Sequence, residues 1–521
     1  MGTDLFFIYK TKIKQEYKTA FWFTFLAVLS IHLYKFVNTL PNHDSVYNYY
    51  SDQNVLGSGR WALSIACGLS SYYDLPWVIG ILSCIAIALT VVVITALFKL
   101  NNPILIALSG ALLAASPSTT ETFFFQFTAD GYFIAMLLAS LGVYWSRIEE
   151  TRITRHILSI VCICVSCGIY QAYVSFALIL ALCYFIDVLL KNIHNKHQCI
   201  RWVGRQAIIY ILALAFYYII WRFCLSFTDT PVNNYQGISQ VGNISLSLIS
   251  GGFVRSIKSI LLYFLQFNVL KHGFPLYSIL SILFLAVMAI GLVIAYRNSR
   301  IYTRKWALVL LILCLIAVIP FSCIWHFVSD SVGYRPMMLQ CLNLLFILTA
   351  ILFERWTSLR IKNIVCLFLV FIALHNALMA NVAYFYMHRC YERSYAEGLE
   401  MMLDIHKMQD EYEFDRVAII GTRIFEIQFD PLDSKTGKAN VAGDIHILTS
   451  LLEESLLYDK EHTALFLQGT FGLDLETVNG AELVELSQCE QIQALPCWPA
   501  EKSMVVINNV LIIKLSNTIL P

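Results

Sequence analysis

The sequence predicts a polytopic membrane protein, built as a bundle of transmembrane helices followed by a small soluble α/β domain. Of the 521 residues, 58% are hydrophobic and only 14% are charged, and the mean hydropathy of +0.65 is far above that of a soluble domain. Apolar runs of membrane-spanning length recur up to about Tyr386, after which the composition becomes that of a soluble protein. We therefore expect a transmembrane domain at 1–386 and an α/β domain at 387–521.

The charge balance and the cysteines exclude two other classes of protein. The 36 Lys and Arg residues nearly equal the 35 Asp and Glu residues, so there is no basic excess of the kind that nucleic-acid binders carry. Most of the 15 cysteines lie inside apolar runs, without the spacing of a zinc site. We expect neither a nucleic-acid partner nor a structural metal.

Membrane-spanning helices need about 20 mostly apolar residues each. The segments that satisfy this requirement, or nearly so, lie at roughly 20–37, 76–98, 103–117, 131–146, 207–225, 274–296, 306–325, 337–353 and 364–386. The stretch 157–190 is too long for one crossing of a roughly 30 Å hydrocarbon core, so we expect two short spans with a turn near Gly168–Gln171. The total is about eleven spans.

The distribution of basic residues predicts the orientation. With a cytoplasmic N-terminus, the connections on the inner side carry most of the loop Lys and Arg residues, as the positive-inside rule requires. An odd number of spans then places the α/β domain outside. The amphipathic segment 254–268 is predicted to lie in the membrane interface.

The α/β domain is read from short apolar runs. Segments 416–421 and 504–514 are predicted strands, and 445–458 is a predicted helix. Cys489 and Cys497 would lie in an oxidising compartment, and a disulfide between them and two free thiols are equally compatible with the sequence.

The first outer loop, 38–75, is the richest in polar functional groups. Asp44 has two interpretations: a general base that deprotonates a sugar hydroxyl, or the cap of a short interfacial helix with His43 as its polar neighbour. Arg60 lies beside Gly59 at the membrane surface, where a guanidinium can grip a phosphate or merely reach the lipid headgroups.

Two further outer loops repeat this mixture of acid, arginine and aromatic residues. The Phe-rich loop 118–130 contains Glu121 and ends at Asp130, which could also cap the following span. The loop 326–336 contains Arg335, a second candidate for holding a lipid phosphate. Sugar rings stack on aromatic faces, and the candidates for such a lining, each of which could instead be an ordinary residue of the aromatic belt, are Trp61, Tyr170, Trp325 and Tyr334.

Taken in order, these pieces resemble a known family. The series consists of His43-Asp44, Gly59-Arg60, the Phe-rich loop ending in Asp130, Tyr170-Gln171-Ala172 and Gly333-Tyr334-Arg335. It resembles the multi-spanning glucosyltransferases that modify bacterial O-antigen and convert serotype, over most of the membrane part. The family usually shows an Asp-Asp pair and Gly-Arg-Pro, whereas this chain has His43-Asp44 and Gly59-Arg60-Trp61.

The resemblance implies a glycosyltransferase of the GT-C type in the bacterial inner membrane, with an active site at the periplasmic face. It implies transfer of glucose from undecaprenyl-phosphate glucose to the O-antigen of lipopolysaccharide, with a donor synthase and a flippase as possible partners. Asp44 and Asp130 are then the candidate catalytic residues, and Arg60 and Arg335 the candidate phosphate ligands. The candidate sugar or acceptor contacts are His43, Trp61, Glu121, Tyr170, Gln171 and Tyr334. A monophosphate leaving group requires neither a metal nor a cofactor on chemical grounds.

Two other functions remain open from the sequence. A transporter or flippase of a lipid-linked sugar would need ionisable residues near mid-bilayer, where His375 is the main example in this chain. A related transferase or O-antigen polymerase with a different donor would use the same residue types, because sugar identity depends on the shape of a pocket.

Overall fold

Helices make up most of the structure, which is a computed structural model that describes residues 12–233, 237, 245–265, 276–356, 358–422, 455–457 and 459–517. Two units can be distinguished. In the described chain, the first unit comprises residues up to Asn38 and from Asp52 to Val382. The second comprises Thr39–Ser51 and the described residues from Ala383 onward. A short piece of the first outer loop thus belongs to the same unit as the C-terminal region.

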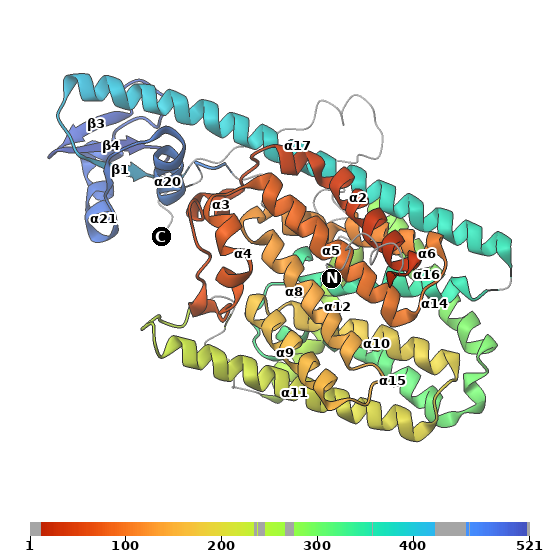
Figure 1. The fold of residues 1–521 in the computed structure, drawn as a ribbon. Coiled ribbons are helices and arrows are strands. Elements are labelled where there is room, and N and C mark those ends of the chain that lie inside the picture. Colours follow the sequence, from red (N-terminus) through yellow and green to blue (C-terminus); the bar gives the residue numbers. More distant parts are fainter. Residues whose placement is uncertain are drawn as a thin grey trace, which may run out of the picture. The chain divides into compact units, whose positions relative to one another are not determined.

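The first unit is a bundle of long apolar helices (Figure 1). Among the described residues, ten helices are long and apolar enough to cross a membrane. They are α2 (Gln15–Val37), α5 (Pro76–Phe98), α8 (Gln126–Trp145), α10 (Tyr173–Lys191), α11 (Lys196–Leu225), α12 (Leu246–Leu265), α14 (Leu276–Asn298), α15 (Lys305–Ser322), η5 with α16 (Pro336–Glu354), and α17 (Leu359–Glu411). The predicted polytopic helical bundle is confirmed.

One additional span is broken in the middle. Helices α6 (Pro103–Ala114) and α7 (Pro117–Phe124) are bent by 43° and together are long enough for an eleventh crossing. The break has a local cause, because Pro117 starts α7 and cannot continue the hydrogen-bond ladder of α6. The Ser116 hydroxyl accepts the Thr119 N–H and so caps the new helix.

The long apolar stretch 157–190 is divided as predicted. Helix α9 (Ile153–Ile169) ends at Tyr170, whose backbone is extended, and α10 begins at Tyr173. The segment expected to lie in the interface belongs to α12, which starts earlier, at Leu246, and has the length and composition to span a membrane. Its position in the interface stays a prediction.

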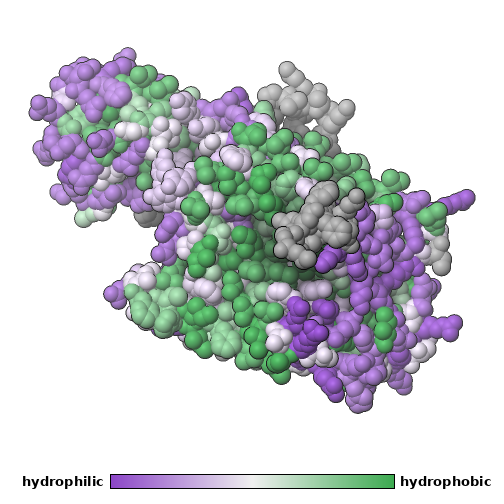
Figure 2. Space-filling model, viewed as in Figure 1, coloured by the Kyte–Doolittle hydropathy of each residue, from purple (hydrophilic) through white to green (hydrophobic). Residues whose placement is uncertain are grey.

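Small residues allow the helices to approach closely. A Cβ on Gly80 of α5 would meet the Phe36 ring of α2 at 2.5 Å, and a Cβ on Gly142 of α8 would meet Ile163 of α9 at 2.7 Å. Large apolar side chains on the outer faces, such as Ile211 and Leu367, remain exposed. Hydrophobic side chains also cover much of the bundle face seen in Figure 2, and such a surface suits contact with lipid tails.

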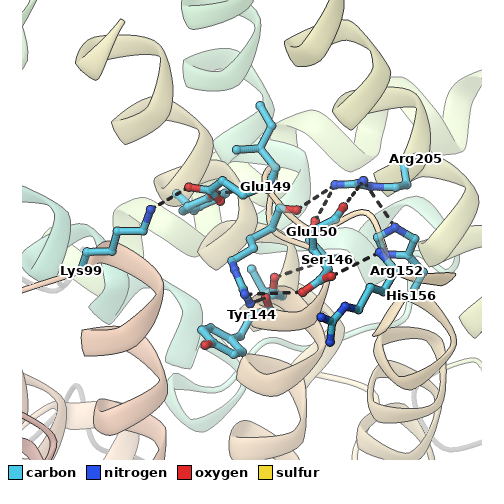
Figure 3. A network of polar contacts seen from close by, with 12 residues as sticks. Lys99, Tyr144, Ser146, Glu149, Glu150, Arg152, His156 and Arg205 are labelled. Atoms are coloured by element: carbon cyan, nitrogen blue, oxygen red, sulfur yellow. Dashed lines mark hydrogen bonds and ion pairs between the residues drawn. The ribbon is translucent and has the colours of Figure 1, made fainter. Parts of the chain in front are cut away.

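A network of polar contacts joins the loops at one end of the bundle (Figure 3). Arg205 of α11 donates to the carbonyls of Arg147 at 2.8 Å and Glu150 at 2.6 Å, in the connection between α8 and α9. Lys99, after α5, forms an ion pair with Glu149 at 2.9 Å. Buried Asp187 of α10 pairs with Lys191 at 2.7 Å and with Arg355. The connections that follow α5, α8, α10 and α16 therefore meet at one end of the bundle.

The second unit contains a four-stranded sheet of order β2-β1-β4-β3, formed by β1 (Arg416–Ile420), β2 (Glu476–Thr477), β3 (Met504–Ile507) and β4 (Val510–Lys514). Strand β1 pairs in parallel with β4, whereas β3 and β4 form a hairpin. Asn508 and Asn509 both have positive φ, so the predicted strand 504–514 turns back on itself.

Helices complete the second unit, including α20 (Lys460–Phe471), α21 (Gly480–Gln488), α22 (Glu490–Gln493) and the last part of α17. Met401 and Ile405 of α17 pack with Val417, Leu467 and Leu511 in one core cluster. Cys489 and Cys497 are free thiols, so the disulfide alternative is wrong. The predicted helix 445–458 lies mostly outside the described residues.

Candidate functional site

The part of the first outer loop that belongs to the first unit positions Arg60. The 3-10 turn η1 (Leu56–Ser58) ends at Gly59, which has a φ of +81° and therefore a left-handed conformation. A Cβ at this position would also lie 2.4 Å from the Tyr217 hydroxyl and 2.7 Å from Gln171 Nε2. Only glycine fits here, and the tight turn presents Arg60 just before helix α4 (Leu63–Tyr72).

Two tyrosines orient the Arg60 guanidinium. Arg60 Nη1 donates to the Tyr132 hydroxyl of α8 at 2.9 Å, and the guanidinium carbon lies 4.8 Å from the centroid of the Tyr170 ring. The Tyr132 and Tyr170 rings are stacked on each other, with centroids 4.3 Å apart. A cation over an aromatic ring gains roughly 0.5–2 kcal/mol, so this arrangement holds the arginine in one direction.

Gln171, in the break between α9 and α10, connects the loops around Arg60. Its Nε2 donates to the Ser58 carbonyl at 2.7 Å and to the Tyr217 hydroxyl at 3.1 Å. The backbone carbonyl of Gln171 accepts the indole N–H of Trp325 at 3.1 Å. The break that the sequence predicted therefore ties together three segments that are far apart in the chain.

These segments enclose a pocket whose chemistry is that of an aromatic box with one guanidinium. Its lining residues include Ser58, Arg60, Tyr170, Gln171, Tyr217, Tyr218, Trp221, Trp325, Ser329 and Met338. Aromatic faces bind the C–H surfaces of sugar rings, and an arginine binds phosphate. The predicted residues Arg60, Tyr170, Gln171 and Trp325 are thus brought together around one pocket.

Sequence reasoning missed the wall that α11 contributes. Tyr217 and Trp221 are four residues apart and stack with centroids 6.4 Å apart on one face of the helix. The Tyr217 hydroxyl donates to the Gly59 carbonyl, and Trp221 Nε1 donates to the Leu56 carbonyl at 2.9 Å. The aromatic spacing in 216–221 is the sequence signal for this helix face, but within the apolar run 207–225 it does not distinguish a pocket wall from a lipid-facing surface.

Trp61 and Tyr334 lie around the pocket without being among its lining residues. A Cβ on Gly168 would meet the Trp61 ring at 2.4 Å, so this indole packs closely on α9. The Tyr334 hydroxyl accepts the Trp325 backbone N–H at 3.1 Å. Tyr334 therefore supports the segment that carries Trp325.

His326, the neighbour of Trp325, is a buried polar residue beside this segment. Its Nε2 is 2.9 Å from the Ser259 hydroxyl, and its ring lies 4.6 Å from the Tyr334 ring. Burial, with a contribution from the charge of Arg255, lowers the pKa of His326 to about 4. The imidazole is therefore neutral at physiological pH.

Glu121 and Arg335 are associated with each other and with the start of η5. Glu121, in α7, is fully buried and accepts the backbone N–H of Met337. The charge of Arg335 acts on this carboxyl group, and the Arg335 guanidinium lies 5.7 Å from the Phe125 ring centroid. Met338, next to Met337, lines the pocket, so Glu121 lies behind that wall.

Asp130 is also buried, inside helix α8. Its carboxylate accepts a hydrogen bond of 2.5 Å from the Ser70 hydroxyl of α4 and one of 2.9 Å from the backbone N–H of Gly131. Because α8 begins at Gln126, Asp130 lies beyond the first turn, and its interpretation as the helix cap is wrong. Its carboxylate instead joins α8 to the helix that follows Arg60.

Asp44 and His43 belong to the second unit, on the short helix α3 (His43–Tyr47). The cap of α3 is Asn42, whose side chain accepts the Ser45 N–H at 3.0 Å, so the interpretation of Asp44 as the cap is wrong. Asp44 Oδ1 is 3.1 Å from His43 Nε2, and the Asp44 side chain is 41% exposed. This carboxylate is accessible from solvent.

The described ranges contain no group of three or more His, Cys, Asp or Glu side chains arranged to hold a metal ion. The pocket's own groups, a guanidinium, hydroxyls, an amide and aromatic rings, suit a phosphorylated sugar.

Comparison with known proteins agrees with this chemistry. The profile described as "Glucosyl transferase GtrII" matches residues 33–340, which include Arg60, Asp130, Gln171 and Trp325. No curated protein and no solved structure gives a match. Since the matched region covers more than half of the chain and contains the whole aromatic pocket, the protein belongs to the GtrII family of glucosyl transferases and is a multi-pass membrane glycosyltransferase.

Proposed function

We propose that this glucosyltransferase moves glucose from undecaprenyl-phosphate glucose to the O-antigen of lipopolysaccharide at the periplasmic face of the inner membrane. The observation that carries the proposal is the aromatic pocket with Arg60 in its wall, within a chain of the GtrII family. A glucosyl phosphate needs both an aromatic surface and a cation, and the pocket offers both.

An apolar groove supports a donor with a lipid tail. A cavity of about 430 Å³ lies between α10, α11 and α15, lined almost entirely by apolar side chains. Its lining includes Val174, Leu214 and Ile324, which lie at most three positions along the chain from Ala172, Tyr217 and Trp325 of the aromatic pocket. A polyprenyl chain in this groove would leave its phosphate near the pocket.

The proposed reaction is a direct displacement at the anomeric carbon. Asp44 acts as the base that takes the proton from an O-antigen hydroxyl, and the hydroxyl oxygen forms the new bond to the anomeric carbon. The bond from that carbon to the phosphate oxygen breaks, and undecaprenyl phosphate leaves. Arg60 and Arg335 stabilise the negative charge that develops on the leaving phosphate.

The remaining candidate residues have supporting roles in this proposal. Asp130 is a second candidate base, and His43, Trp61, Glu121, Tyr170, Gln171 and Tyr334 contact or support the sugar and the acceptor. A bacterial donor synthase and flippase supply the donor at the outer surface. The transporter alternative is disfavoured because the matched family is one of transferases.

Mass spectrometry of lipopolysaccharide tests the proposal. An O-antigen-bearing host that makes undecaprenyl-phosphate glucose is compared with and without the protein and with its Asp44→Asn variant. We expect one added hexose on repeat units with the wild type only, and a loss of about 100-fold or more in transfer for Asp44→Asn.

Other results would change the assignment. Full activity of Asp44→Asn with an inactive Asp130→Asn would move the base to Asp130. A missing hexose with wild type, despite confirmed donor and membrane insertion, would contradict the proposed donor and acceptor. An added group of different mass would indicate another sugar.

A further inference from the structure

The short helix α3, which carries Asp44, packs against helix α20 within the second unit. Its apolar face belongs to one cluster, in which Val46 is buried with Leu456, Leu457 and Phe466. Tyr49, just after α3, lies so close to α20 that a Cβ on Gly469 would meet its ring at 2.7 Å. The segment that carries the proposed base is thus part of the hydrophobic packing of the C-terminal region.

Polar contacts connect the same two helices. The Tyr47 hydroxyl donates to Glu461 Oε2 at 2.8 Å, across 414 positions in the sequence. Burial and this hydrogen bond raise the pKa of Tyr47, so its phenol stays protonated and remains a donor. The hydrogen bond fixes the end of α3 that is one turn beyond Asp44.

A histidine of α20 lies against two aromatic side chains of α3, one on the residue before Asp44 and one three residues after it. The His462 ring lies 5.7 Å from the His43 ring and 4.6 Å, edge to face, from the Tyr47 ring. Asp459 fixes this imidazole, because its Oδ1 is 2.8 Å from His462 Nδ1 and also accepts the His462 N–H. Burial tends to raise the pKa of Asp459, but the hydrogen bonds from His462 outweigh it and hold the pKa below its usual range.

We infer that α20 carries positioning residues for the transfer reaction: Glu461 and His462, oriented by Asp459, hold α3 so that Asp44 is presented in one direction. The inference rests on the proposed role of Asp44 as the base. It assigns the C-terminal region a part in the chemistry. These residues act through α3 and do not themselves touch the reacting atoms.

Full-length variants in a transfer assay with undecaprenyl-phosphate glucose and O-antigen lipopolysaccharide test this inference. Tyr47→Phe removes only the hydroxyl, Glu461→Ala removes its exposed acceptor, and Glu485→Ala removes an exposed carboxylate of α21 as the matched control. We expect kcat to fall about tenfold in each of the first two variants, with the donor KM unchanged, because misplacing a catalytic group costs rate rather than binding. Glu485→Ala should behave as wild type.

Two combinations separate positioning from general stability. The Tyr47→Phe/Glu461→Ala double variant should be no slower than the slower single variant, since both changes remove the same hydrogen bond. Added to Asp44→Asn, Glu461→Ala should leave the residual rate unchanged, because a positioning residue has no effect once the group it positions is gone.

The possible failures can be told apart. Normal kcat in both single variants, or multiplying effects in the double variant, would overturn the inference while an inactive Asp44→Asn leaves the proposed function intact. An active Asp44→Asn would instead remove the proposed base, and the positioning role with it. Should Tyr47→Phe fail to fold, Glu461→Ala and its combination with Asp44→Asn still decide the question, because Glu461 is exposed.

Discussion

The two ends of the helical bundle both use arginines, but in different surroundings. At one end, Arg205 donates to backbone carbonyls of the α8–α9 connection (Figure 3). Arg355, which follows α16, pairs with the buried Asp187. At the other end, Arg60 lies against Tyr132 and Tyr170 and lines a pocket. Arginines that close loops on carbonyls and carboxylates serve stability, whereas an arginine in an aromatic pocket is placed to meet an anionic ligand.

Breaking the Asp187 cluster should have the largest effect on stability. Asp187→Ala leaves Lys191 and Arg355 without this carboxylate, and the loss of one partner of a buried pair costs about 3–5 kcal/mol. We expect the free energy of unfolding to fall by about 3 kcal/mol, the lower end of this range, because the side chains of both cations are 31% exposed. Thermal unfolding in detergent measures it, and the kcat of the folded fraction should be unchanged.

The control for this prediction is Arg152→Gln, an exposed arginine at the same end of the bundle. The free energy of unfolding of this variant should lie within about 0.5 kcal/mol of the wild-type value. Equal destabilisation by both variants would show that the end as a whole, rather than the buried carboxylate, is sensitive to change.

Arg60→Ala should reduce activity rather than stability. We expect a loss of about 100-fold in kcat/KM, or about 2.7 kcal/mol of transition-state stabilisation, with little change in unfolding temperature. Arg60→Lys should recover only part of the rate, because an ammonium group cannot bind a phosphate in a bidentate manner.

Arg222→Ala provides the comparison for Arg60. Arg222 is an exposed arginine on α11, beside the pocket residue Trp221 in sequence, and is suited to reach the lipid headgroups. If its replacement reduces transfer as strongly as that of Arg60, the effect reflects a general need for surface charge, and the specific role of Arg60 is contradicted.

The extent to which the sequence predicts this arrangement differs between the backbone and the site. Hydropathy and charge were sufficient for the bundle and for the division of 157–190 at Tyr170, because membrane spans follow from length and apolarity alone. The site was harder to predict, since its walls come from distant segments. Nothing in the local pattern around Tyr217 or Trp221 indicates that they face Gly59 and Leu56.

Helix capping is also difficult to predict from residue type alone. Asp44 and Asp130 were both acceptable caps by residue type, but α3 begins after Asn42 and α8 begins at Gln126. A shift of a few residues in a helix boundary therefore changes the interpretation of a carboxylate. The association of Asp44 with α20 depends on packing across more than 400 residues and leaves no local pattern.

Gly59→Ala should reduce activity by an intermediate amount. The substitution requires a left-handed backbone for alanine and places a Cβ against Tyr217 and Gln171, so the turn must move and Arg60 moves with it. We expect kcat/KM to fall about tenfold, because guanidinium geometry is sensitive to shifts of about 1 Å. Gly333→Ala, where a Cβ would meet nothing within 4 Å, is the matched control and should retain full activity.

The pH dependence of stability tests the packing around His326, the residue that follows Trp325 in the chain. His326 has a pKa of about 4 in the folded protein, below the value of about 6.5 expected for an unfolded chain. Between these values the unfolded state binds the proton more readily, so the folded state loses stability as the pH falls from about 6.5 to about 4. His326→Gln keeps a group that can form a hydrogen bond with Ser259 but cannot titrate, and its unfolding temperature should fall less over this range than that of wild type.

His197→Gln, which changes an exposed histidine of α11, is the control and should retain the wild-type pH dependence. Parallel pH profiles for wild type and His326→Gln would mean that His326 is not held neutral by its buried position, and that the segment carrying Trp325 is more open to water than the packing of His326 against Tyr334 indicates.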